Sequence, residues 1–134
     1  MRLVFLFLGM VLVAACTDTE LVGMQQLSKG AQLYKANCAN CHQENGAGLA
    51  KLMPPLAESD YLAANFTQLP CLIRNGNRTP MVVNGITYTQ AMPASPHLSE
   101  QDIAAICVFV GQKFLVPGQT LSDSVFKAVL KSCP

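Results

Sequence analysis

Two cysteines and a histidine lie close enough in this sequence to act as one chemical unit. Cys38 and Cys41 are three residues apart, and His42 follows the second cysteine directly. This Cys-x-x-Cys-His order is typical of covalent haem attachment. Each thiol can add across one vinyl group of the porphyrin, and the adjacent imidazole is then placed below the iron. The motif predicts one covalently bound haem c, with His42 as an axial ligand of the iron.

The same pattern has two other interpretations, a thioredoxin-like redox pair and half of a zinc site. Zinc would need a second Cys/His pair, and the sequence contains no such pair. A thioredoxin-like motif would lie in a βαβ pattern, and none surrounds Cys38 and Cys41. Haem attachment is therefore favoured over both.

The second axial ligand decides between an electron carrier and a haem enzyme or sensor with an open iron. Four side chains could occupy this position: Met53, Met81, Met92 and His97. Met81 begins a predicted hairpin, and Met53 precedes two prolines close to His42, which makes a return to the opposite haem face awkward. Met92 precedes Pro93, whose fixed φ favours an extended loop that can present a side chain to the iron. His97 would give a bis-histidine iron of lower potential, but it stands at a helix entry, where histidines are usually on the surface.

A helix before the motif and a loop after it are the first elements predicted to position it. Ser28 can cap a helix that runs toward Cys38, with Leu33 and Tyr34 on its apolar face. Residues 43–51 contain two glycines and are predicted to form a loop. The motif would therefore lie at the C-terminal end of the first core helix.

Two short capped helices and one hairpin are predicted in the middle of the chain. The helices are residues 60–64 after the cap Ser59 and residues 68–75 after the cap Thr67. Gly76 would end the second helix. The hairpin has two β-branched runs between Met81 and Tyr88 that flank Asn84-Gly85, a strong turn signal because both positions need positive φ.

Two further helices are predicted toward the C-terminus. Ser99 opens the clearest helix of the chain, because Glu100 and Asp102 lie in its positive first turn and an apolar stripe continues to Phe114. A last helical pattern covers residues 121–131. Together the elements predict an all-α fold of about four to five helices with a short β-hairpin and an extra C-terminal helix.

The N-terminal residues have the layout of a secretory signal. Residues 3–13 form an unbroken apolar run behind Arg2, shorter than the ~20 residues of a membrane-spanning helix. Val13-Ala14-Ala15-Cys16 resembles a bacterial lipobox, in which the cysteine is lipidated and becomes the first mature residue. Ordinary cleavage that leaves Cys16 a spare thiol is the alternative. We expect a signal peptide at residues 1–15, a lipid-anchored tether at 16–26, the main domain at 27–116 and a helical extension at 117–134.

Composition narrows the range of partners. The chain has nine Lys plus Arg and eight Asp plus Glu, and loss of Arg2 with the signal leaves eight of each. A nucleic-acid partner would need a basic surplus to neutralise phosphates, so none is expected. The length of 134 residues, with 51% hydrophobic, suits one domain with a single core.

Several segments together resemble a class I monohaem cytochrome c of the bacterial type. Beyond the Cys38–His42 motif, the matching segments are residues 54–56, 82–88, 91–94 and 97–105, the last of which leads into the last core helix. The resemblance covers about residues 27–114. It implies a cytochrome c fold around one covalently attached haem.

The resemblance also implies roles for individual residues. The haem contacts it implies are thioethers at Cys38 and Cys41, a proximal ligand at His42 and a distal sulfur at Met92. It further implies that the backbone carbonyl of Pro54 hydrogen-bonds the other ring nitrogen of His42 and so orients the ring. Gly30 and Tyr34 match positions where the first helix crosses the last, near Phe109. A glycine at such a crossing permits close approach of two backbones.

Three cysteines remain after lipid and haem: Cys71, Cys107 and Cys133. Cys107 lies on the apolar stripe of the last core helix, where the family usually has an aliphatic residue, so it is interpreted as a small hydrophobic residue. In an oxidising compartment two of the three are expected to form a disulfide, and Cys71 with Cys133 is the favoured pair, although a sequence alone leaves the connectivity open. Such a bond would link the C-terminal extension covalently to the domain.

The predicted function is a single-electron carrier of a respiratory chain, not an enzyme. The expected partners are a respiratory donor and a terminal oxidase or periplasmic reductase. The expected location is the periplasmic side of a membrane in a Gram-negative bacterium. The alternatives are a haem subunit of a larger complex and an open-site haem enzyme or sensor.

Overall fold

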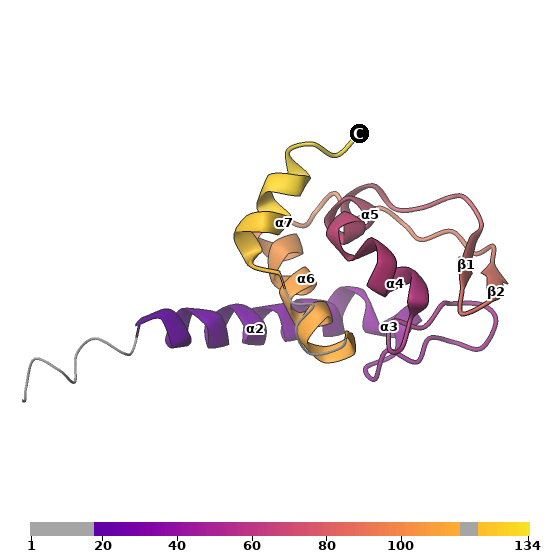
Figure 1. Ribbon diagram of the computed structural model, residues 1–134, viewed down its shortest axis with the longest axis horizontal. Coiled ribbons are helices and arrows are strands. Elements are labelled where there is room, and N and C mark those ends of the chain that lie inside the picture. Colours follow the sequence, from indigo (N-terminus) through magenta and orange to yellow (C-terminus); the bar gives the residue numbers. More distant parts are fainter. Residues whose placement is uncertain (1–17, 116–120) are drawn as a thin grey trace, which may run out of the picture.

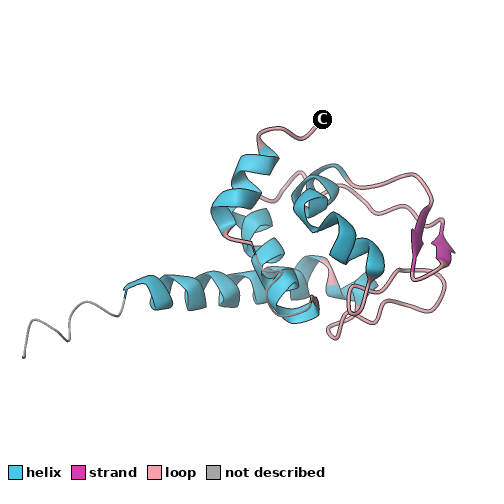
Figure 2. Cartoon of the chain, viewed as in Figure 1, coloured by secondary structure: helices cyan, strands magenta, loops and turns pink. Residues whose placement is uncertain are grey.

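The chain folds into packed helices, with one short hairpin at the end opposite the projecting half of the first helix (Figure 1 and Figure 2). The computed structural model describes residues 18–115 and 121–134. Its elements are α2 (Asp18–Asn37), α3 (Ala39–His42), α4 (Asp60–Asn65), the 3-10 helix η1 (Phe66–Gln68), α5 (Leu69–Asn75), β1 (Met81–Val83), β2 (Ile86–Tyr88), α6 (Glu100–Phe114) and α7 (Asp123–Leu130). Within those ranges, no helix combines the length and apolar character needed to cross a membrane.

The helices α2 and α6 cross at Gly30 and form the centre of the fold. A Cβ atom at Gly30 would collide with the backbone carbonyl of Ala105 and lie 2.8 Å from the Cβ of Phe109. Only glycine permits this approach. One turn further along α2, the ring of Tyr34 packs on Phe109 with 5.2 Å between centroids. The predicted contacts of Gly30 and Tyr34 with Phe109 are therefore present.

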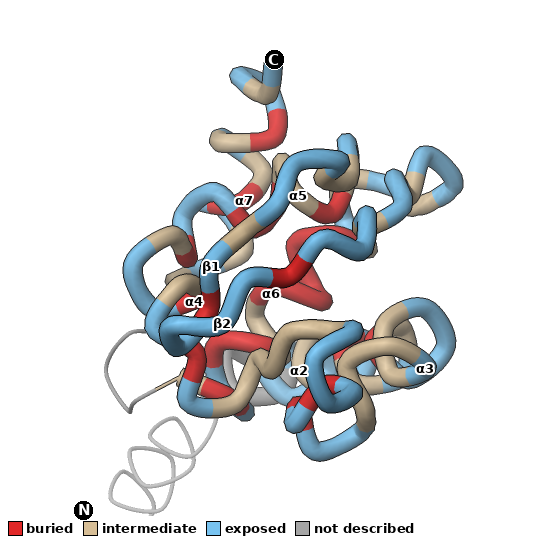
Figure 3. Tube along the Cα trace, turned by 90° about the vertical axis from the view of Figure 1, so that its right-hand side faces the viewer, coloured by how far each residue is buried: buried red, intermediate tan, exposed pale blue. Residues whose placement is uncertain are grey.

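The helix α6 begins and ends where the sequence predicts. The hydroxyl of Ser99 accepts a hydrogen bond from the amide of Asp102 at 3.2 Å, and the carboxylate of Asp102 accepts one from the amide of Ser99 at 3.1 Å. This reciprocal pair fixes the first turn. Residues 103–107 are fully buried, and Figure 3 shows this stretch of α6 inside the molecule.

The hairpin also agrees with its prediction. Strands β1 and β2 are antiparallel, with Val83 opposite Ile86. Asn84 and Gly85, at the turn, have φ values of 50° and 75°. Both are positive, as the Asn-Gly signal requires.

Two predicted helix starts are wrong. Thr67 does not cap α5, because it lies inside η1, and α4, η1 and α5 follow one another without an intervening loop. Ser28 does not cap the first helix, because α2 already begins at Asp18. The segment expected to be a tether is therefore helical from that residue onward. Extending an existing helix adds one hydrogen bond per residue without a new nucleation cost, and acidic residues at its start favour the N-terminal end.

The C-terminal extension is part of the same core. On α7, Phe126 is 0% exposed and meets the ring of Phe66 edge-on at 5.3 Å. Leu130 is also buried. A disulfide joins Cys71 on α5 to Cys133, the pairing that the sequence favoured. The expected lipid anchor at Cys16 lies outside the described residues.

Candidate functional site

A cavity of about 690 Å³ lies between the Cys-x-x-Cys-His motif, the hairpin, α5 and α6. Its volume is within the range of about 300–1,000 Å³ that is usual for cofactor and ligand pockets. In the described part of the chain, its wall contains no Lys, Arg, Asp or Glu. Apolar side chains from α4, α5, α6 and the hairpin contribute to it, among them Leu62, Leu69, Ile73, Val83, Ile106 and Val110. The cavity therefore suits a large, flat and mainly apolar group such as haem.

The motif forms a tight helical turn on this wall. The amide of Cys38 donates to the carbonyl of Tyr34 at 2.8 Å and so continues α2. In α3, the amides of Cys41 and His42 both donate to the carbonyl of Cys38, at 3.1 and 2.9 Å. Cys38, Cys41 and His42 all line the cavity. The structure brings together the three residues that the motif predicts to act as a unit.

The imidazole of His42 is oriented by a backbone carbonyl. Its Nδ1 lies 3.0 Å from the carbonyl oxygen of Pro54, the contact that the resemblance implied. Nδ1–H donates to this oxygen, which leaves the lone pair of Nε2 free for a metal. Burial lowers the pKa of His42, and the bond to Pro54 opposes that shift. The neutral ring required of an iron ligand is therefore favoured.

A hydrogen bond from Tyr34 fixes the backbone after His42. Its hydroxyl donates to the carbonyl of Gln43 at 2.7 Å. Gln43 has a φ of 64°, which is uncommon for a residue other than glycine. The amide of Gln43 also donates to Ala39 at 2.9 Å, so the residue is held from both sides. The sequence carried no signal for the Tyr34 bond, because its acceptor is a backbone atom whose position depends on the fold.

The structure separates the candidate distal ligands. Met53, Met81 and Met92 line the cavity, whereas His97 does not. The side chain of His97 is exposed, and its Nε2 lies 3.0 Å from Oδ1 of Asn37. Met53 directly precedes Pro54, whose carbonyl contacts His42. Met92 comes from the loop before α6 and packs against the core.

The backbone of Met92 is paired with Asn77. The amide of Met92 donates to the carbonyl of Asn77 at 2.8 Å, and the amide of Asn77 donates back at 2.9 Å. Asn77 was not identified from the sequence. Its role is carried by main-chain atoms, which leave no side-chain pattern to detect.

Burial raises the pKa of two thiols, those of Cys38 and Cys107. Burial, with a smaller effect from Cys41, raises the pKa of Cys38 to about 11. Burial also raises the pKa of Cys107, which is a free thiol inside α6. A thioredoxin-like thiol would instead have a lowered pKa. Among residues 18–115 and 121–134, no group of three or more His, Cys, Asp or Glu side chains could hold a metal ion. Neither alternative interpretation of the motif gains support.

Comparison with known proteins identifies similar chains. A family model described as cytochrome C oxidase, cbb3-type, subunit III matches residues 25–110. This match includes the Cys-x-x-Cys-His motif, Pro54 and Met92, and it stops within α6, before the C-terminal extension.

Individual relatives carry related names. The cytochrome c subunit of alcohol dehydrogenase (quinone) from Gluconobacter oxydans is 33% identical over 113 residues, which is 81% of this chain and 23% of that protein. The subunit of the same name from Komagataeibacter europaeus is 37% identical over 104 residues, 73% of this chain and 22% of that protein. Cytochrome c-552 from Thermus thermophilus is 35% identical over 81 residues, 58% of this chain and 61% of that protein. The chain thus spans less than a quarter of the length of the dehydrogenase subunits that it matches.

Proposed function

Because this chain belongs to the family of c-type cytochromes described as cytochrome c oxidase, cbb3-type, subunit III, we propose that it is a single-electron carrier of a respiratory chain. Membership of the family means that the chain carries one covalently bound haem c, has the cytochrome c fold and serves haem-based electron transfer. The respiratory role and the ligand set are the proposed part. One observation carries the ligand set: Cys38, Cys41, His42 and Met92 all line the same cavity. The family description supports the respiratory role.

We assign the haem contacts residue by residue. Cys38 and Cys41 form the two thioethers, Nε2 of His42 is the proximal ligand and the sulfur of Met92 is the distal ligand. The carbonyl of Pro54, 3.0 Å from Nδ1, keeps the ring of His42 in one orientation and raises its basicity as a ligand.

The surroundings of the site suit electron transfer. When bound, haem supplies the one-electron iron couple, and the chain supplies orientation and environment. Among the described residues, the cavity wall has no Lys, Arg, Asp or Glu. This apolar wall favours reduced iron, and so would a thioether ligand, so a positive midpoint potential is expected. The backbone bonds at Gln43 and Asn77 hold the two ligand segments in place. A change of iron charge would then need little rearrangement.

The proposed partners are a respiratory donor and a terminal oxidase or periplasmic reductase. A second candidate is a haem subunit of a larger complex, favoured by relatives named as subunits of a quinone alcohol dehydrogenase and by the family description. Purification of the tagged full chain from membranes distinguishes the two. Stoichiometric recovery of an oxidase or dehydrogenase indicates the subunit, and recovery of the cytochrome alone indicates the mobile carrier.

The proposed location is the periplasmic face of a membrane, through a lipid on Cys16. The apolar run at residues 3–13 and the small residues before Cys16 support it. Cys16→Ser should move the haem protein from the membrane fraction to the soluble periplasmic fraction. An unchanged distribution would refute the lipid anchor.

The ligand set is tested by Met92→Leu, which keeps the side-chain volume nearly constant. Met53→Leu and Met81→Leu are the matched controls, because both residues also line the cavity. Only Met92→Leu should lose the ferric sulfur–iron absorption band, and only this variant should bind carbon monoxide readily when reduced. Acid–acetone should extract no haem from any of the four proteins.

Other results would change the assignment. Loss of the band in Met81→Leu alone would make Met81 the distal ligand. An unaltered protein that lacks the band and binds carbon monoxide would indicate an open iron and overturn the carrier function.

A further inference from the structure

We propose that the C-terminal segment, residues 121–134, positions the loop that carries Met92, and that Arg74 is the positioning residue through which it acts. The proposal deepens the function above, because it rests on Met92 as the distal ligand. The segment lies outside residues 25–110, the part matched by the family model. The family model therefore does not account for this segment.

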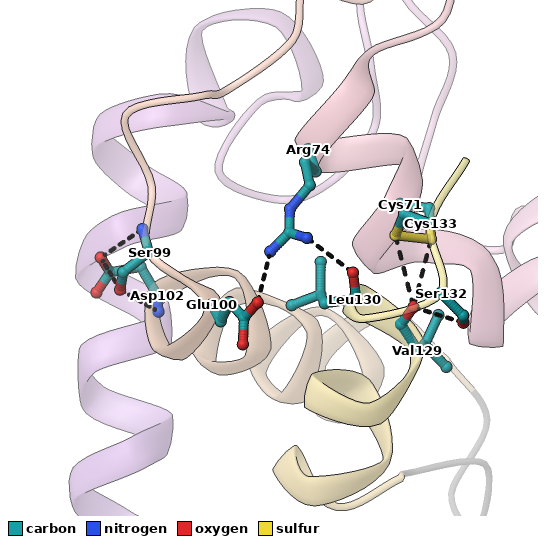
Figure 4. Close-up of polar contacts among 9 residues, drawn as sticks. All are labelled: Cys71, Arg74, Ser99, Glu100, Asp102, Val129, Leu130, Ser132 and Cys133. Carbon is teal, nitrogen blue, oxygen red and sulfur yellow. Dashed lines mark hydrogen bonds and ion pairs between the residues drawn. A yellow bond between two sulfur atoms is a disulfide. The ribbon is translucent and has the colours of Figure 1, made fainter.

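The helix α5 is bound to the C-terminal segment by hydrogen bonds and a disulfide. Arg74 Nη1 donates to the carbonyl of Leu130 at 2.7 Å, and Nη2 donates to Glu100 at 3.3 Å (Figure 4). The side chain of Asn75 donates to the carbonyl of Pro134 at 3.0 Å. The disulfide to Cys133, also drawn in Figure 4, adds a covalent link one turn earlier on α5.

The guanidinium of Arg74 is suited to this position. Leu130 is the last residue of α7, and the final carbonyls of a helix lack intrahelical donors and carry partial negative charge. Arg74 satisfies one of these carbonyls and at the same time pairs with Glu100 in the first turn of α6. Its rigid fork holds two acceptors on different helices, which a lysine ammonium does less well.

The residues after Arg74 hold the Met92 loop. Asn77 and Met92 exchange two backbone hydrogen bonds, at 2.8 and 2.9 Å. The amide of Ser95 donates to the carbonyls of Ile73 and Arg74, at 3.1 and 3.3 Å. Residues 92–95 are thus held by backbone hydrogen bonds to the end of α5 and the residues that follow it.

Gly76 makes this contact as close as it is. With a φ of +71°, it carries no side chain, and a Cβ there would lie 2.5 Å from the carbonyl oxygen of Met92 and 2.7 Å from the amide of Ala94. The backbone of the Met92 loop is therefore in tight contact with the end of α5. Release of α5 from the C-terminal segment should therefore also loosen the Met92 loop.

Arg74→Leu in the ferric holoprotein tests the proposal. The substitution removes both hydrogen bonds of the partly exposed guanidinium, to Leu130 and to Glu100. Amide hydrogen exchange at Asn77 and Met92 should therefore become about tenfold faster, while amides of α2 change little. The affinity for imidazole, which competes with Met92 for ferric iron, should rise about tenfold. Arg74→Lys should fall between wild type and Arg74→Leu in both measurements.

Arg78→Leu is the matched control for the loss of charge. Arg78 is exposed and makes no hydrogen bond or ion pair with the described residues. Both measurements should stay within about twofold of the wild-type values in this variant. Should Arg74→Leu fail to accumulate, Cys133→Ser cuts the covalent link instead and should accelerate exchange at the same two amides.

Two results would overturn the positioning role. One is exchange at Asn77 and Met92 that is unchanged in both Arg74→Leu and Cys133→Ser. The other is an equal acceleration across all helices, which indicates general destabilisation. The exchange measurement reports on the loop whether or not Met92 binds iron. A wild-type protein without the sulfur–iron band overturns the proposed ligand, and unchanged exchange overturns only the positioning role.

Discussion

Replacing Gly30 with alanine should destabilise the crossing of α2 and α6. The added methyl group would collide with the backbone carbonyl of Ala105 and lie 2.8 Å from the Cβ of Phe109. A backbone oxygen inside a helix cannot rotate away as a side chain can. The helices must therefore separate, which weakens the packing of Tyr34 on Phe109, now 5.2 Å between ring centroids.

Two opposing effects set the change in the free energy of unfolding of Gly30→Ala. Alanine is more favourable than glycine inside a helix by about 1 kcal/mol. Overpacking a core costs about 1–3 kcal/mol, and a clash with backbone lies at the upper end of that range. We expect the free energy of unfolding to fall by about 2 kcal/mol. For a domain near this size, the Tm should fall by roughly 8–16 °C.

The assay is equilibrium unfolding of the ferric holoprotein in denaturant, followed by circular dichroism and by haem absorbance. Gly23→Ala is the matched control on the same helix, because no atom lies within 4 Å of a Cβ added there. It should raise the free energy of unfolding by about 1 kcal/mol. Gly30→Ala with a stability equal to or above the wild type would refute the reasoning, since the helices could then not be in backbone contact at this point.

Three further predictions concern other parts of the site and core. Tyr34→Phe removes the bond to Gln43 and should lower the free energy of urea unfolding by about 1 kcal/mol; a value unchanged from wild type would contradict a structural role for the hydroxyl. Hydrogen bonds with Lys29 and Ser99 hold the pKa of Asp102 at about 2, below its usual value. The contribution of Asp102 to stability is therefore present above about pH 4 and is lost as the pH falls toward 2. Asp102→Asn should flatten this part of the curve of stability against pH, and an equally steep curve would count against the pair. Cys107, buried and protonated, should react with iodoacetamide only at the rate of global unfolding, and faster labelling in the native protein would show that α6 opens locally.

Features that depend on neighbouring residues were predictable from the sequence. The Asn84-Gly85 turn needs two positive φ angles, and the structure has them. The box formed by Ser99 and Asp102 involves residues only three apart. The spacing of Cys38, Cys41 and His42 predicts that they act as a unit, because residues three and four apart are neighbours on one helix face.

Local patterns failed where continuing a helix competes with starting one. Ser28 and Thr67 both have good capping side chains, yet each lies inside a helical stretch. A cap is favourable only if the helix begins there. Whether it begins there depends on the residues before it and on what they pack against.

The sequence by itself determined the chemistry of this protein. The residues for haem attachment, the apolar stripe of α6 and the order of the elements all follow from residue type and spacing. Only the tertiary structure decided how that chemistry is held in place. The bonds from Tyr34 to Gln43, from Asn77 to Met92 and from Arg74 to Leu130 all end on backbone atoms of another segment. Every residue carries the same carbonyl and, proline aside, the same amide, so the choice among them is made by packing and leaves no trace in the order of side chains.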